Sequence, residues 1–288
     1  MKEINNLSGF IEKNIKPNIG RLILTKNYFD ENGILKSEKN SLTFGTGFKY
    51  SGLIISCAHI LSLRNTLEED ENLLKKLKSK NVKPRDLKKF LFENIKEAKI
   101  EFYNGDSFIL EIIDSDLKHD CSIFKFKQDN KNKELNKNLN LDKQIELTEG
   151  AEVAFAGFPT EVPNYRLDNT PFTVNEGIIS AFPYLKVAGL EAYPHIQVNA
   201  VNLGGNSGAP LFLKNSGNVI GIISGNQIKA FNLVDINNKG EIGKTHDNPK
   251  ALVNVFGITY VSPIKYIINL IENISIKKEI KNLRVGDY

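Results

Sequence analysis

The chain of 288 residues has few cysteines and no long apolar run. Its only two cysteines, Cys57 and Cys121, are too few for the disulfide framework of a small secreted domain. We expect both thiols to be small buried hydrophobic groups, with a redox role as the less favoured alternative. No apolar run of signal-peptide length opens the sequence, and no stretch of about 18 apolar residues could span a membrane. These absences predict a soluble protein of the reducing cytoplasm.

Clustered positive charge is also missing. The chain carries 38 Lys and Arg residues against 34 Asp and Glu residues, and the two signs are interleaved. Nucleic-acid binding needs cations gathered on one face, and no glycine pattern matches a phosphate-binding loop. His119, His195 and His246 lack the spacing of metal ligands. We therefore expect no nucleic-acid or membrane partner, no metal and no cofactor.

What the sequence does contain is a repeated pattern of short β-strands. Runs rich in Val, Ile and Phe alternate with Gly, Asn and Asp turn signals through most of the chain. This pattern is typical of antiparallel barrels or sandwiches. We expect an N-terminal segment and a first β half in residues 1–140, and a second β half with a C-terminal helix in residues 141–288. The polar stretch 129–144 is expected to link the two halves.

Two segments depart from the β pattern. Apolar residues at helical spacing within residues 65–99 predict a helical hairpin, divided at Pro84 and inserted into the first β half. One interpretation of this insertion is a solvated surface decoration, and the other is a docking surface or lid that controls access to a site. Residues 263–274 predict an amphipathic helix that packs on the second β half.

Three short motifs contain candidate catalytic residues. In GGNSGAP, Ser207 stands between glycines on a sharp turn, where the N–H groups of Gly205 and Ser207 could stabilise an oxyanion. His59 follows an apolar strand in IISCAHI and offers the neutral imidazole that a hydroxyl nucleophile needs as its base. Asp120 heads the apolar run CSIF, and its carboxylate could accept the Nδ1 proton of that imidazole.

Each motif alone also has an ordinary explanation: a glycine turn, a core histidine and a turn aspartate. Asp114 and Asp116 compete with Asp120, which we prefer because it directly abuts the apolar strand. The motifs become informative through their order, since the histidine and the aspartate fall in the first β half and the serine in the second.

In this order, the motifs SCAHIL, HDCSIFKF and GGNSGAPL resemble those of the trypsin-like, chymotrypsin-fold serine peptidases. The closer likeness is to the bacterial HtrA (Deg) branch of that family. The segments FGTGF, GAEVAFAGFP and TVNEGIISA match further motifs of the branch. The likeness runs from about residue 20 to residue 263 and excludes the helical insertion.

The resemblance implies an all-β fold of two six-stranded antiparallel β-barrels, to which the helical hairpin and the C-terminal helix are added. It implies a serine endopeptidase with His59, Asp120 and Ser207 as its catalytic triad and the N–H groups of Gly205 and Ser207 as its oxyanion hole. It also implies a substrate-binding pocket, which we expect near Val201, Asn202, Ser224, Gly225, Asn226 and Gly257. None of these residues is acidic, so a small or medium apolar side chain is expected before the cut.

Three departures from the family pattern bear on regulation. Asn206 replaces the aspartate that pairs with a new N-terminal ammonium in digestive trypsins, so we expect no such zymogen switch. Gly204 replaces the usual proline, which could loosen the oxyanion loop. The chain stops soon after residue 263, so we expect no PDZ domain. The sequence thus predicts a peptidase acting on protein or peptide substrates, regulated by a signal or by a protein partner that docks on residues 65–99. The alternative is a catalytically inactive binding module.

Overall fold

The computed structural model describes residues 4, 6–30, 34–63, 67–78, 87–127, 139–144, 146–160, 170–185, 192–226, 229–231, 234–236, 242–245, 251–253 and 257–285. Among these, residues 67, 68, 76–78, 229–253 and 276–285 are described by their backbone only.

The first six strands close into an antiparallel barrel in the order β1-β2-β3-β6-β5-β4. They are β1 (Ile19–Phe29), β2 (Leu35–Tyr50), β3 (Leu53–Ser56), β4 (Ile95–Phe102), β5 (Ser107–Asp116) and β6 (Cys121–Phe126). Burial alternates along the strands as a pleated backbone requires: on β1, Leu22, Leu24 and Lys26 are buried and the residues between them are partly exposed. The interior position of a lysine on this strand is unusual.

A second closed antiparallel barrel has the order β11-β18-β13-β12-β7-β8. Its strands are β7 (Glu152–Gly157), β8 (Thr173–Ala181), β11 (Ile196–Asn199), β12 (Pro210–Leu213), β13 (Val219–Asn226) and β18 (Ile258–Pro263). Val153, Phe155, Leu211, Ile223 and Val261 are fully buried in its core. The prediction of two six-stranded antiparallel barrels is therefore confirmed.

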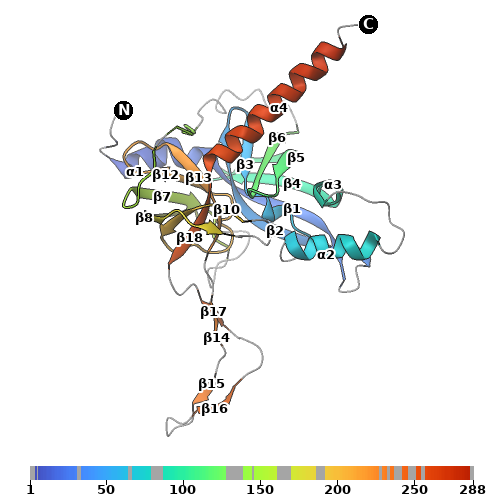
Figure 1. Ribbon diagram of the computed structural model, residues 1–288, viewed down its shortest axis with the longest axis horizontal. Helices are drawn as coiled ribbons and strands as arrows, with labels where there is room; N and C mark the ends of the chain where they lie inside the picture. The colour runs from blue at the N-terminus through green and yellow to red at the C-terminus, as the bar shows by residue number, and fades with distance from the viewer. Residues whose placement is uncertain are drawn as a thin grey trace.

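Three small two-stranded sheets accompany the barrels. They pair β9 (Tyr184–Leu185) with β10 (Tyr193–Pro194), β14 (Lys229–Phe231) with β17 (Ala251–Val253), and β15 (Val234–Ile236) with β16 (Ile242–Thr245). In Figure 1 the four strands β14 to β17 project from the second barrel as a narrow extension between β13 and β18. The sequence patterns did not predict this extension.

The helical insertion consists of α2 (Leu67–Lys78) and α3 (Leu87–Glu93), which contact each other. The predicted end of the insertion at residue 99 is wrong, because residues 95–99 belong to β4. The Asn94 N–H turns back to the carbonyl of Leu91, and Ala98 and Ile100 are then buried at alternating strand positions. Residues 65, 66 and Pro84 lie outside the described residues.

The C-terminal helix α4 (Ile264–Val285) begins near the predicted start but runs beyond residue 274. It packs on β13 and β18 of the second barrel, as expected, and also on β5 and β6 of the first (Figure 1). Its buried residues Ile264, Ile267 and Leu270 belong to the same hydrophobic cluster as the first barrel, so α4 joins the two barrels.

Four short helical turns complete the described elements, namely α1 (Leu7–Phe10), η1 (Ile11–Ile15), η2 (Lys16–Asn18) and η3 (His59–Leu61). Among the helices in the described part of the chain, none combines the length and the apolar character needed to cross a membrane. Cys57 and Cys121 are both free and fully buried, as the sequence predicts. Of the predicted linker, the part at residues 139–144 lies against the second barrel, where Leu141 forms a bridge with Val219.

Candidate active site

Three predicted site residues from separate segments meet where the two barrels join. His59 opens η3 after β3, and Asp120 stands in the turn directly before β6. Because β3 and β6 pair with Ser56 opposite Ser122, the chain leaving β3 lies beside the chain entering β6. Ser207 comes from the second barrel, in the loop before β12. The fold thus brings a histidine and an aspartate of one barrel to a serine of the other.

The His59 ring links the other two side chains. Its Nδ1 lies 2.9 Å from Asp120 Oδ2, and its Nε2 lies 2.9 Å from Ser207 Oγ. A carboxylate only accepts hydrogen bonds, so Nδ1 carries the proton and Nε2 is left as an acceptor facing the serine hydroxyl. This arrangement can transfer the Ser207 proton to the imidazole.

The Asp120 carboxylate is buried and fully hydrogen-bonded. Its Oδ1 accepts the N–H groups of Ala58 at 3.0 Å and His59 at 2.7 Å. Its Oδ2 accepts the Ser224 hydroxyl in addition to His59 Nδ1. The residue has a φ of 52°, in the left-handed region that aspartate tolerates in turns. Four donors around one carboxylate fix its orientation toward the ring.

The electrostatic environment of His59 favours the charged imidazole. Burial is the largest single influence and would lower the pKa of His59, but the Asp120 carboxylate and then Cys57 act in the opposite direction, and the net pKa lies well above the ordinary value of 6.5. The imidazolium that forms when the ring takes a proton from Ser207 is therefore stabilised where it forms.

The loop at residues 204–207 has all four of its carbonyl oxygens hydrogen-bonded. In chain order, their donors are the Thr160 N–H (2.7 Å), the Thr46 hydroxyl (2.8 Å), the Ala209 N–H (2.9 Å) and the Thr46 N–H (2.8 Å). Every peptide orientation in the loop is therefore fixed by a partner outside it or by a turn. The Gly204 carbonyl has Thr160 as its partner, and a loosening of the loop by Gly204 stays a prediction.

The N–H groups of the same loop divide into two classes. Those of Asn206 and Gly208 donate to the carbonyls of Leu203 at 3.2 Å and Ile223 at 2.8 Å. Within the part of the chain that the structure describes, the N–H groups of Gly205 and Ser207 donate to no protein acceptor. Buried backbone donors are nearly always paired, so these two are available to an incoming acceptor.

Their direction follows from peptide geometry. The peptide bonds are trans, and a trans peptide points its C=O and its N–H in opposite directions. The Gly205 N–H therefore points away from Thr160, and the Ser207 N–H away from Ala209. These are the two donors that the sequence analysis named as an oxyanion hole, and the geometry suits them to hold a negatively charged oxygen.

Only glycine fits at position 205. Its φ is +96°, and a Cβ there would lie 2.5 Å from the Phe158 carbonyl oxygen and 2.6 Å from the Thr160 nitrogen. Thr160 therefore does two things at once: it holds the Gly204 carbonyl and closes the space beside Gly205. Sequence reasoning did not single out Thr160, and it noted Thr46 only as part of the FGTGF motif.

The predicted substrate-binding residues occupy different environments. Val201 is 52% exposed, whereas Asn202 is buried, and the Asn226 side-chain amide donates to the Asn202 carbonyl at 2.9 Å. Ser224 is also buried, and its hydroxyl is bound to Asp120. The Ser224 side chain therefore supports Asp120, and a substrate contact at Ser224 stays a prediction for its backbone. Gly225 follows it on β13, opposite Tyr260 of β18.

Cys57, His59 and Asp120 also have the composition of a metal site, with ligand atoms within 4.8 Å of one another. Their chemistry does not fit one. The Asp120 oxygens already accept four hydrogen bonds. Burial raises the pKa of the Cys57 thiol, whereas a metal needs the thiolate. The Cys57 sulfur, 3.7 Å from His59 Nε2, is better described as a packing neighbour of the ring.

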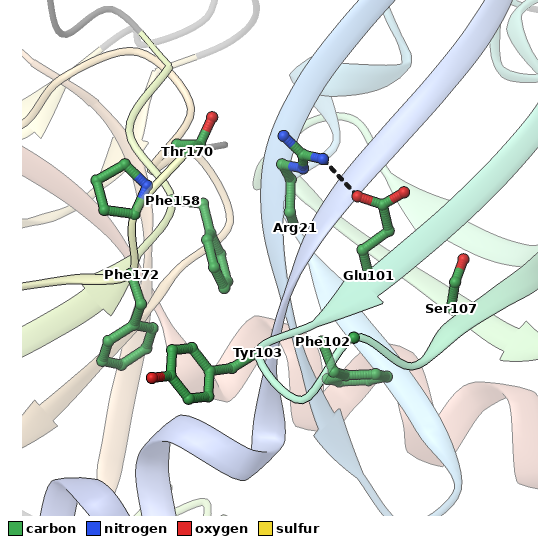
Figure 2. A pocket seen from close by; sticks show the side chains of 10 residues that line it. Arg21, Glu101, Phe102, Tyr103, Ser107, Phe158, Thr170 and Phe172 are labelled. Carbon is green, nitrogen blue, oxygen red and sulfur yellow. Dashed lines mark hydrogen bonds and ion pairs between the residues drawn. The ribbon is translucent and has the colours of Figure 1, made fainter. Parts of the chain in front are cut away.

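A cavity of about 440 Å³ is lined by residues of both barrels. Figure 2 shows Phe158 and Phe172 of the second barrel on one side and the Arg21–Glu101 ion pair of the first barrel on the other, with the Tyr103 ring reaching across to contact Phe172. Phe158 connects this cavity to the candidate site, since its N–H donates to the Thr46 hydroxyl at 3.1 Å.

Comparison with known proteins places this geometry in context. Residues 45–222 match the protein family described as "Trypsin-like peptidase domain". The fold is similar to "HtrA-type protease AlgW with tripeptide" and "HtrA-type protease AlgW with decapeptide", each with a TM-score of 0.55 and 18% identity. The alignments cover 93% of this chain but only 63% and 67% of those two chains. No curated protein sequence matches the chain.

Proposed function

Because the chain belongs to the trypsin-like peptidase domain family, we propose that it is a serine endopeptidase with His59, Asp120 and Ser207 as its catalytic triad. One observation carries the proposal. The two ring nitrogens of His59 lie at the same distance, 2.9 Å, from the Asp120 carboxylate and the Ser207 hydroxyl. That geometry deprotonates an alcohol and then protonates a leaving group.

In the proposed reaction, Ser207 Oγ attacks the scissile carbonyl carbon while His59 Nε2 takes its proton. The carbonyl oxygen becomes an oxyanion and receives hydrogen bonds from the N–H groups of Gly205 and Ser207, each typically worth about 10²–10³ in rate. Asp120 keeps the imidazolium in place. His59 then gives the proton to the departing amine, and a water molecule activated by the same ring hydrolyses the acyl-enzyme.

The proposed substrate is a protein or peptide in an extended conformation. Support comes from AlgW, whose structures are described with a tripeptide and a decapeptide. Near the pocket, Val201, Asn202 and Asn226 carry no charge, and Val201 is exposed and apolar. We therefore propose cleavage after small or medium apolar side chains, with substrate contacts from Val201, Asn202, Gly225 and Asn226 and from the backbone of Ser224.

We further propose that the peptidase works in the cytoplasm and is regulated by a protein partner that docks on the helical insertion. The exposed face of α2, which includes Glu69, Asn72 and Lys75, offers a polar surface for such a partner. Ordering of the oxyanion loop is not the proposed point of control, since its carbonyls already have partners.

The test is cleavage of an unfolded protein substrate, with new N-termini identified by mass spectrometry. Wild type is compared with Ser207→Ala and His59→Ala, and Ser180→Ala on exposed β8 serves as the matched serine control. Cleavage that is lost in the first two variants and kept in the third supports an endopeptidase. The absence of any Ser207-dependent cleavage, across peptide libraries and with candidate partners added, would leave the inactive binding module as the better hypothesis.

A further inference from the structure

Lys26 is a fully buried lysine whose ammonium binds the segment after His59. It occupies an inward position on β1 and is 0% exposed. Its Nζ donates to the carbonyls of Ile60 and Ser62. Ile60 lies within the η3 turn and Ser62 directly follows it. Carbonyls at the end of a helical turn have no partner within the turn. A cation inside a barrel core persists only with such partners.

Asp70 holds the next residue of the same segment. It lies on α2 of the helical insertion and is 0% exposed. Both of its carboxylate oxygens accept the Leu63 N–H, at 2.9 and 3.2 Å. Leu73 and Leu74 are buried on the same helix, so α2 packs its apolar side and this carboxylate toward the barrel.

The two buried charges act on each other. Burial lowers the pKa of Lys26 to about 7, and the Asp70 carboxylate acts in the opposite direction by attracting the ammonium. Lys26 and Asp70 therefore form one charge cluster that binds a single backbone segment: the ammonium binds the carbonyls of residues 60 and 62, and the carboxylate binds the N–H of residue 63.

This cluster completes the support of the His59 turn. On one side, Asp120 accepts the N–H groups of Ala58 and His59. On the other side, Lys26 and Asp70 hold residues 60–63. The turn that carries the ring is thus anchored at both ends, and one anchor comes from a helix outside the barrel.

We propose that Lys26 and Asp70 are positioning residues for His59, and that through Asp70 the insertion helix α2 is coupled to the catalytic base. The inference rests on the proposed function and deepens it, since it names the route by which a partner on the insertion reaches the triad. A partner that shifts α2 moves Asp70 and the backbone of Leu63, and with them the turn that aims His59 at Ser207.

The experiment measures how fast a fluorophosphonate probe labels Ser207, because that rate depends on proton removal by a correctly placed His59. Asp70→Ala removes the acceptor, Asp70→Asn keeps an acceptor but loses the charge, and the double variant K26M/D70N removes both charges. Glu71→Ala is the matched control, being the exposed neighbour on α2 whose partner is the surface residue Lys75. Thermal melts identify the variants that are folded at the labelling temperature.

We expect Asp70→Ala to label roughly ten- to a hundredfold more slowly, with unchanged reversible affinity for the probe, because small misplacements of catalytic groups cost rates of this size. Asp70→Asn should recover part of the rate, and Glu71→Ala should match wild type. If Asp70→Ala does not fold, the labelling rate of K26M/D70N tests the proposal in its place. Replacing both ions is better tolerated than leaving one of them unpaired.

A folded K26M/D70N protein that labels at the wild-type rate, with the wild-type pH profile, would overturn the inference. Failure of both Asp70→Ala and K26M/D70N to fold would also overturn it, by assigning the cluster to stability alone. Wild-type protein that cannot be labelled at all would instead count against the proposed function.

Discussion

Thr46 donates its side-chain hydroxyl to the carbonyl of Gly205 at 2.8 Å, and its backbone N–H to the carbonyl of Ser207 at 2.8 Å. Thr46 belongs to β2 of the first barrel, and both acceptors belong to the second. The first barrel therefore supplies the histidine and the aspartate and also fixes the loop that carries the nucleophile. Relative movement of the barrels would disturb the triad and the oxyanion donors together.

Replacing Thr46 with valine tests this role. Valine keeps the shape but leaves the Gly205 carbonyl and the Phe158 N–H without their shared partner. We expect a loss of stability of about 1–3 kcal/mol. Because the loop loses a fixed peptide orientation, the rate of Ser207 acylation should fall about tenfold or more. Thr43→Val, on the same strand, should change neither quantity in denaturant unfolding and acylation assays, and equal effects of the two variants would refute the role of Thr46.

Gly205→Ala should remove an oxyanion donor from its position. Gly150 has a similar left-handed φ, +84° against +96°, but no atom within 4 Å of the place of its Cβ. Gly150→Ala therefore measures the backbone strain alone. We expect Gly205→Ala to lower kcat/KM by about 10²–10³ beyond any change in Gly150→Ala. Comparable activities of the two folded variants would mean that the loop adapts and that position 205 is not a required donor.

The pH dependence of the reaction should report His59. The ring must be neutral to accept the Ser207 proton, and Asp120, with a smaller effect of Cys57, raises its pKa well above 6.5 despite burial. Activity should therefore rise with pH through a value above 6.5. In Asp120→Asn the raising charge is gone, so this limb should move to lower pH, while the plateau falls by about 10⁴. Asp116→Asn, which disturbs only the pair with His119, should leave the limb in place.

Lys26 should make folding stability depend on pH. Its pKa of about 7 in the folded protein lies below the ordinary 10.5, so the unfolded chain binds more protons between these values. Folding stability is therefore highest, as far as Lys26 is concerned, above pH 10.5, where the side chain is neutral in both states. That stability is lost as pH falls toward 7, because the unfolded chain takes up a proton that the folded protein does not. In urea unfolding, the unfolding free energy of wild type relative to Lys26→Met should rise with pH across this window, by up to about 1.4 kcal/mol per pH unit. A difference independent of pH would show that Lys26 does not change its charge there.

The parts of the fold that the sequence predicts are those with local patterns. Alternating apolar residues predict the strands. His59, Asp120 and Ser207 each stand in a short sequence motif, which can be recognised without knowing the three-dimensional contacts. The end of the helical insertion was misplaced because Ile95 fits both a helical stripe and the first position of β4. Only the burial of Ala98 and Ile100 in the closed barrel decides between them.

The parts that the sequence could not predict depend on contacts between distant segments. Thr46 and Gly205 are 159 residues apart, and neither residue type signals that one will bind the other. Lys26 reads as an ordinary polar residue in an alternating strand, because its partners at residues 60 and 62 are invisible until the barrel closes. The hydrogen bond from the Ser224 hydroxyl to Asp120 could not be predicted for the same reason, since it crosses from one barrel to the other.

The most direct measurement is to react the purified protein with a fluorophosphonate probe and locate the adduct by mass spectrometry. A single adduct on Ser207, formed by wild type and absent from Ser207→Ala and His59→Ala, is the expected result, because the hydroxyl becomes nucleophilic only when the imidazole removes its proton. No adduct on the folded wild-type protein, or one that forms equally fast without His59, would contradict the claim that these side chains act as one catalytic unit.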